Sequence, residues 1–181
     1  MALEQPDYEV LLVMGDIEFR RYAPYNVAEV TVDGSSPDRE AFGILAGYIF
    51  GDNADDEKMS MTAPVETSDR RYAFVMEKKY PLDALPRPDN EHIRLLTRPE
   101  RIVAVRRFSG RWTLQNFSRN ESLLLDGLSK IGVEVSGRPE LARYNSPFTP
   151  WFLRRNEIIV PITALPAAGA RAVDAEVAAS L

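Results

Sequence analysis

The sequence predicts an α+β domain in which two β-α-β-β halves build one curved antiparallel sheet or barrel with two helices packed against it. Short β-rich runs alternate with two long amphipathic segments along the 181 residues, which is typical of this class. The two halves also resemble each other, which indicates an internal repeat about a pseudo-twofold axis. Ile17, Val27, Ala28 and Gly34 recur 76 positions later as Ile93, Val103, Ala104 and Gly110.

The later part of each half repeats at a slightly larger spacing. Ala63-Pro64-Val65 recurs as Ser146-Pro147-Phe148, and Arg70-Arg71 recurs as Arg154-Arg155. We attribute the larger spacing to a longer second helix and a longer connection after it.

Three strands are expected before the first helix. Residues 8–14 and 17–22 are β-rich runs around Gly15-Asp16, a two-residue linker that indicates a hairpin. Residues 25–32 form a third run of the same kind.

The first helix is expected to begin at Ser36-Pro37, where a capping hydroxyl precedes a proline in the first helical position. It should run for about 14 residues and bury one apolar stripe. That stripe contains Phe42, Leu45 and Ile49, with Ala41 and Tyr48 beside it.

A polar turn opened by Gly51 should follow this helix, and then a strand. In that strand Met59 and Met61 would share one face, opposite residues 58, 60 and 62. Pro64 cannot donate to a central ladder, so it indicates an edge or a kink near a cleft.

The second half is expected to follow the same order. Residues 71–77, 92–97 and 101–108 read as strands, and the proline-rich residues 81–90 as a loop. A helix over residues 113–131 is capped by Thr113 and ended by Gly132. Its apolar stripe contains Leu114, Phe117, Leu124, Leu125, Leu128 and Ile131. Residues 141–146 and 157–162 are the last strands, joined by an aromatic and proline-rich segment.

Composition restricts the function classes. The net charge is −5 and the sequence pI is about 5.1, which argues against binding to nucleic acid or to anionic lipid. Without cysteine, disulfides and thiolate chemistry are excluded. We expect a cytoplasmic protein with a single domain over residues 1–162 and an alanine-rich tail over residues 163–181.

A second face of the first helix is a candidate binding surface. Two glycines within five residues of a helix cost about 1 kcal/mol each relative to alanine, so a close approach is indicated there. The approaching group would be a flat ligand, the barrel itself or a second chain in a homodimer. This face contains Arg39, Gly43, Ala46, Gly47 and Phe50.

Two longer motifs resemble the SOUL heme-binding protein family over roughly residues 8–162. They are Tyr48-Ile-Phe-Gly-Asp-Asn53 followed by Lys58-Met-Ser-Met-Thr-Ala-Pro-Val65, and Arg154-Arg-Asn-Glu-Ile158. The resemblance implies a distorted β-barrel flanked by two long helices, and binding of heme or a related tetrapyrrole. It also implies that Arg39 meets a heme propionate, whereas Gly47 stands where animal members carry a second propionate-binding group, a lysine.

Each of the other candidate pocket residues could instead have a purely structural role. Met59 and Met61 could be soft iron ligands or pocket walls, or simply core. Tyr144, Phe148 and Trp151 could line the opposite wall of the groove or close the end of the barrel. Beside them, Arg154 could hold a carboxylate in a bidentate contact.

His92 is the only histidine, so the metal ligand set stays unknown. It follows a proline-rich loop and precedes a strand, which favours a surface residue over an axial ligand. No catalytic residue is assigned.

We therefore expect a binding protein for heme or another tetrapyrrole that uses apolar contact and arginine, without a strong axial ligand. One alternative is an enzyme acting on a linear tetrapyrrole or another small molecule, for which a Glu or Tyr with a displaced pKa in the groove, such as Glu77 or Tyr144, would be the signature. Another is a small-molecule sensor or dimerisation module without a heme role.

Overall fold

The computed structural model describes residues 3–34 and 36–167. It contains nine strands, two α-helices and two short 3-10 helices. In chain order they are β1 Tyr8–Met14, β2 Ile17–Tyr22, β3 Tyr25–Thr31, α1 Pro37–Ile49, β4 Val65–Ser68, β5 Arg71–Val75, η1 Leu82–Ala84, β6 Arg94–Arg98, β7 Arg101–Phe108, α2 Leu114–Lys130, β8 Glu140–Arg143, η2 Trp151–Leu153 and β9 Asn156–Pro161.

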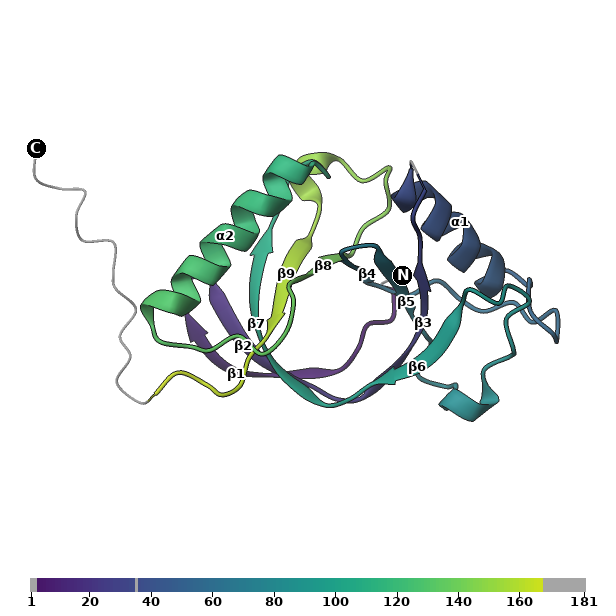
Figure 1. Cartoon of the computed structure of the whole chain (residues 1–181), viewed down its shortest axis with the longest axis horizontal. Helices are drawn as coiled ribbons and strands as arrows, with labels where there is room; N and C mark the ends of the chain where they lie inside the picture. The colour runs from purple at the N-terminus through teal and green to yellow at the C-terminus, as the bar shows by residue number, and fades with distance from the viewer. Residues whose placement is uncertain (1–2, 35, 168–181) are drawn as a thin grey trace, which may run out of the picture.

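All nine strands belong to one curled antiparallel sheet (Figure 1). The strand order is β1-β2-β7-β9-β8-β4-β5-β3-β6, and each neighbouring pair is antiparallel. β1 and β6 end the sheet, so the described chain forms a half-barrel. Of the two forms expected from the sequence, a curved sheet or a barrel, the structure therefore has the curved, open sheet. The α+β class predicted from the sequence is confirmed.

Both helices lie on the same face of this sheet, one over each half (Figure 1). α1 packs on β3 and β5, and its side is sealed by Ala41, Leu45, Tyr48 and Ile49. α2 packs on β7 and β9 through Leu124 and Leu128, which are fully buried. The strands β4 and β8 pass between the two helices, so the middle of the sheet is the part that the helices leave uncovered (Figure 1).

The opposite, inner face of the sheet has its own core. Its buried residues come from six strands, β2, β3, β5, β7, β8 and β9, and from the segments that join them. They are Tyr22, Tyr25, Val27, Ala63, Ala73, Val75, Val103, Val105, Ala142, Tyr144 and Ile159. Burial on both faces explains why β7 and β9 read as nearly continuous apolar runs.

Local signals placed several elements correctly. The Gly15-Asp16 hairpin forms, with Met14 opposite Ile17 and Gly15 at φ +59°. Thr113 caps α2, because its Oγ1 accepts a hydrogen bond of 3.2 Å from the backbone N–H of Asn116. Gly132, with φ +70°, follows the end of α2 as expected.

Four local predictions are wrong. The segment with Met59 and Met61 forms no strand; its backbone is anchored by a bond from Met59 N to Ile49 O, and the strand forms later, at β4. Ser36 makes no side-chain cap, although α1 begins where expected. Phe42 is 46% exposed and Leu114 82% exposed, so neither belongs to the buried stripe of its helix.

The expected tail falls largely outside the described residues. After β9, Thr163 N bonds to Glu134 O, and residues up to 167 continue without a helix or strand. Residues 168–181 are not described.

Candidate functional site

A groove lies beside the first half of α1, above the uncovered middle of the sheet. Its volume is about 340 Å³, within the range of small-molecule sites. Five separate segments contribute to it: α1, the adjoining strands β4 and β5, the residues before α2, and β8 with the loop after it. The lining residues are Asp38, Arg39, Phe42, Val65, Tyr72, Phe74, Trp112, Arg143, Asn145 and Pro147.

Aromatic rings form much of its surface. The rings of Phe42 and Phe74 meet edge to face, with centroids 5.4 Å apart. Tyr72 and Phe74 alternate with inward-facing residues on β5, so both point to the helix-bearing face. Trp112 adds a ring whose Nε1–H donates to the buried Asn156 at 2.8 Å, which fixes the orientation of the indole. Such a surface suits a flat, apolar ligand.

Positive charge lies along the edge of the groove. Arg39 is exposed on α1 and makes no ion pair with any described residue. Arg143 donates to Thr67 Oγ1 at 3.1 Å, stands 3.4 Å from Asp38, and holds its guanidinium 5.5 Å from the centre of the Trp112 ring. The Asp38–Arg143 contact is long, so Arg143 keeps donors for an acidic group of a ligand.

Tyr72 is the phenol within the groove. Burial, together with the neighbouring Asp38 carboxylate, raises the pKa of Tyr72 to about 12. The phenol therefore stays protonated at neutral pH and acts as a neutral hydrogen-bonding group.

No strong iron ligand lines the groove. None of its described lining residues is His or Met, and the chain has no Cys. The phenolate form of Tyr72, which could bind iron, is disfavoured by the raised pKa. Among the described residues, no group of three or more His, Asp and Glu is placed to hold a metal ion.

The residues on the second face of α1 lie in different environments. Arg39 lines the groove, and it also borders an open hollow that includes Gly43. A Cβ on Gly43 would meet no atom within 4 Å, whereas one on Gly47 would lie 2.4 Å from a carboxylate oxygen of Asp52. Gly47 is thus explained by the fold of the following turn. Ala46 packs partly against the core beneath α1.

The two methionines lie in that same core. Met59 is 4% exposed, and Met61 packs against the cluster from its edge. Neither lines the groove, so the structure places them as packing residues under α1.

Tyr144 belongs to the core on the inner face of the sheet and does not line the groove, although its chain neighbours Arg143 and Asn145 do. Its hydroxyl donates at 2.8 Å to Glu157, a fully buried carboxylate that also accepts from Arg20 and Arg155. Burial and the Glu157 carboxylate raise the pKa of Tyr144 well above its ordinary range. The cluster is a closed set of hydrogen bonds.

Phe148, Trp151 and Arg154 belong to the loop between β8 and β9. Phe148 is 95% exposed and Trp151 49% exposed. Arg154 donates to the backbone oxygens of Pro147 and Thr149, and its guanidinium lies 4.3 Å from the centre of the Trp112 ring. Arg154 therefore packs against Trp112, one of the lining residues of the groove.

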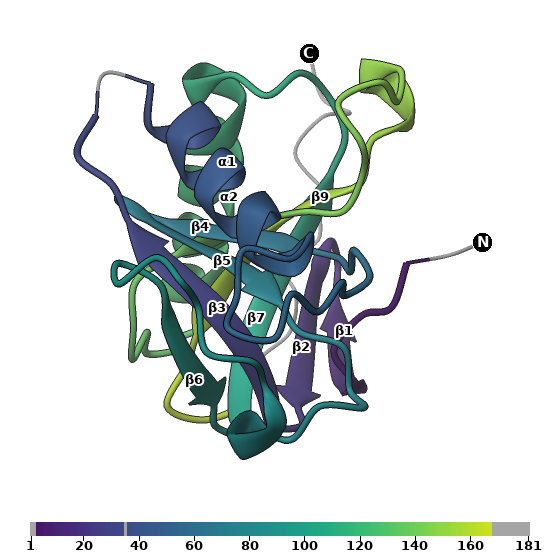
Figure 2. The same cartoon turned by 90° about the vertical axis from the view of Figure 1, so that its right-hand side faces the viewer.

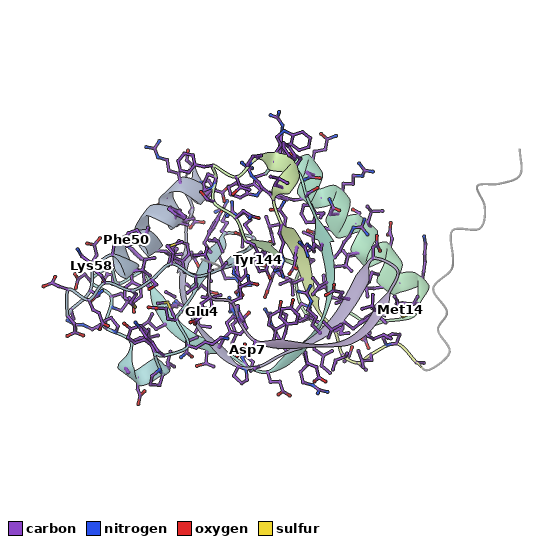
Figure 3. All side chains as sticks on the ribbon, turned by 180° about the vertical axis from the view of Figure 1, so that it is seen from behind. Glu4, Asp7, Met14, Phe50, Lys58 and Tyr144 are labelled. Atoms are coloured by element: carbon purple, nitrogen blue, oxygen red, sulfur yellow. The ribbon has the colours of Figure 1, made fainter. Side chains whose placement is uncertain are left out.

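Phe50 lies at the far end of α1, near Lys58, and is 56% exposed (Figure 3). His92 is exposed in the loop before β6, where its backbone N–H bonds to Asn90. Neither residue lines the groove. Of the residues proposed from the sequence, only Arg39 lines the groove. Arg154 does not line it but contacts the lining residue Trp112.

The sequence-based search missed most of the lining. Phe42 follows Arg39 by one helical turn, and Tyr72 and Phe74 alternate on one strand, so these two spacings were available signals. Trp112 and Arg143 had no local signal, because contacts distant in sequence place them: β8 pairs with β4, and Trp112 donates to Asn156 of β9.

Neither of the two residues named from the sequence as an enzymatic signature lines the groove, although Tyr72, which does line it, has a raised pKa. Although burial opposes it, the hydrogen bond from Ser60 N and the nearby Lys79 lower the pKa of Glu77. Glu77 and Tyr144 both lie outside the described lining residues.

The arrangement defines a class: α+β proteins in which two helices cover one face of a curled antiparallel sheet. Solved structures share the fold at low identity. The C-terminal domain of EcmrR has a TM-score of 0.61 and 11% identity, over 87% of this chain and 99% of that one. A hydrolase from Listeria innocua has a TM-score of 0.60 and 10% identity, over 84% and 94% of the two chains.

The family is narrower than the class. The chain belongs to the SOUL heme-binding protein family, whose model matches residues 3–161. Among curated proteins, none matches this chain. Within the described part of the chain, no helix is long and apolar enough to cross a bilayer.

Proposed function

We propose that this protein binds heme or a related tetrapyrrole in the groove beside α1, without a strong axial ligand. The observation that carries the proposal is the composition of the groove: four aromatic side chains, two arginines and no His, Cys or Met among its described lining residues. Family membership supports the same ligand class.

The chain would hold such a ligand with two kinds of contact. Phe42, Phe74 and Trp112 would meet the apolar ring, while the guanidiniums of Arg39 and Arg143 would pair with its carboxylates. The groove is partly open to solvent, so part of the ligand would stay in contact with water. This favours reversible binding over permanent enclosure.

Heme, when bound, supplies a redox-active iron and its coordination chemistry. The residues of this groove contribute apolar contact, orientation of the carboxylates and a neutral phenol at Tyr72. Binding should therefore depend on the macrocycle and its carboxylates more than on the metal.

Two titrations test the proposal. Hemin should bind saturably with a shift of its Soret band, and metal-free protoporphyrin IX should bind within about tenfold of the same affinity. If the affinity for protoporphyrin IX were more than about a hundredfold below that for hemin, an axial bond to iron would dominate binding.

The matched variants are Arg39→Glu in the groove and Arg94→Glu on the distant edge strand β6. Both change the net charge equally and both sites are exposed. Arg39→Glu should weaken hemin binding about tenfold, because a charge-assisted hydrogen bond is lost and a repulsion is added. Equal effects of the two variants would show only a general charge effect and would remove Arg39 from the site.

We also propose that the fold is a duplicated unit in a single domain. Read outward from the middle of the sheet, the strand orders β4-β5-β3-β6 and β8-β9-β7-β2 correspond, and each includes one helix crossover. A cytoplasmic location remains our expectation from the sequence.

A further inference from the structure

The loop between β8 and β9 exposes a cluster of large apolar side chains. Phe148 is 95% exposed, Trp151 49%, Phe152 58% and Leu153 65%. The loop stands out from the body of the molecule at one end (Figure 2). Contiguous exposed apolar surface of this kind marks an interaction site.

The loop is braced from within, so the exposure of its side chains is built into the fold. Gly110 N donates to Trp151 O at 3.0 Å, and Leu153 N to Pro150 O at 2.9 Å. Arg154 holds two further backbone oxygens of the loop, at 2.8 and 2.9 Å. The rings of Trp151 and Phe152 meet edge to face, 5.6 Å between centroids.

Arginines surround this apolar tip. Arg111 lies 5.8 Å from the centre of the Trp151 ring, Arg107 borders the same depression as Leu153, and Arg154 closes the loop. None of the three forms an ion pair with a described residue. Other arginines of the neighbouring strands are paired with carboxylates, such as Arg106 with Asp16 and Arg155 with Glu157. Among the described residues, the unpaired positive charge beside the tip is therefore that of Arg107, Arg111 and Arg154.

We propose that this loop docks the protein onto an anionic lipid surface. Aromatic side chains on a protruding tip suit the boundary between headgroups and acyl chains, and a surrounding set of arginines suits anionic headgroups. The tip projects outward from the body of the molecule (Figure 2). The net charge of −5, which argued against lipid binding, is a sum over the whole chain and does not describe the surface around this loop.

The docking loop is continuous with the groove. Pro147 lines the groove at the start of the loop, and Arg154 joins the loop to Trp112. A docked molecule would present the groove near the membrane, where apolar ligands concentrate. The lipid proposal itself rests on the loop alone and holds whatever the groove binds.

The experiment is sedimentation of the full chain with vesicles of phosphatidylcholine, alone or mixed about three to one with phosphatidylserine. Binding should require the anionic lipid, fall as salt rises and shift the tryptophan emission to the blue, with the shift lost in Trp151→Phe. The variant Phe148→Ser/Trp151→Ser/Phe152→Ser should lose about tenfold or more in vesicle partition.

Two further variants complete the design. Arg111→Glu should weaken binding to anionic vesicles, and more so at low salt. Val13→Ser, which removes an apolar side chain that is 57% exposed on the edge strand β1, should leave binding unchanged. Thermal unfolding of each variant shows that the fold is retained.

Three results would overturn the proposal. The first is no binding to anionic vesicles at low salt, or binding that the loop variants leave intact. The second is tighter binding to a single-stranded oligonucleotide than to vesicles, which would make the surface a nucleic-acid site. The third is a dimer in light scattering that the triple variant dissolves, which would make the loop a contact between copies.

Discussion

Replacing Phe42 and Leu45 separately by alanine tests which face of α1 belongs to the groove. The two residues lie one helical turn apart, and the sequence placed both in one buried stripe. In the structure Phe42 is 46% exposed at the groove, and Leu45 is fully buried. The two variants should therefore separate stability from binding.

The magnitudes follow from the exposures. Burying a whole phenylalanine side chain is worth roughly 1.5–3 kcal/mol, so the half-buried Phe42 contributes about 1 kcal/mol to the free energy of unfolding. Leu45→Ala removes a fully buried side chain and should cost about 2–5 kcal/mol. For binding, loss of the Phe42 ring should weaken hemin affinity about fivefold to tenfold, since aromatic contacts contribute on the order of 1 kcal/mol.

Urea unfolding followed by circular dichroism and hemin titration by absorbance supply the two readouts. Leu45→Ala, once folded, should bind hemin with affinity near that of the parent. If Phe42→Ala destabilises the fold as much as Leu45→Ala and binds hemin normally, Phe42 is a core residue and the groove is assigned wrongly.

Two other predictions concern the fold. Gly43→Ala should stabilise the protein by about 1 kcal/mol in thermal unfolding, since its Cβ would meet nothing within 4 Å; Gly47→Ala should gain less, because Asp52 must move. If Gly43→Ala weakened hemin binding, a ligand would approach the helix there; if it dissociated a dimer, a second chain would. Glu157→Gln should cost about 1.5–3 kcal/mol of unfolding free energy, because it removes the buried carboxylate bound to Arg20 and leaves that guanidinium with only the partly exposed Glu18 as an ion-pair partner. Despite burial, the bond from Arg20 lowers the pKa of Glu157, so stability should fall as pH drops through that lowered pKa, less steeply in the variant; identical acid transitions would contradict this.

The sequence predicts the elements well where the signal is local. Thr113 followed by an amphipathic run gives the start of α2, and the Gly15-Asp16 linker gives the hairpin between β1 and β2. Residues at the border of an apolar stripe are harder to assign to the core or the surface from sequence. Phe42 stands at the border of the apolar stripe of α1, where helical periodicity alone does not distinguish a core position from a groove position.

The groove depends on pairings distant in sequence. β4 was missed because its four residues become a strand only between β5 and β8. That pairing places Arg143 against Thr67, and the pairing of β8 with β9 sets Asn156, the partner of Trp112, opposite Arg143. Alternation predicted a strand at Met59 and Met61, but these residues alternate because they flank the core under α1. Of the residues proposed from the sequence, Arg39 could be placed in the groove because family resemblance and helix position agreed.

The most direct test of the binding site is amide and indole NMR of the labelled protein during titration with metal-free protoporphyrin IX, whose ring current displaces nearby resonances. We predict saturable shifts that are largest at the Trp112 indole N–H and at the amides of Phe42 and Phe74. Shifts centred on Tyr144 and Leu153, or no saturable shift, would contradict a tetrapyrrole site beside α1.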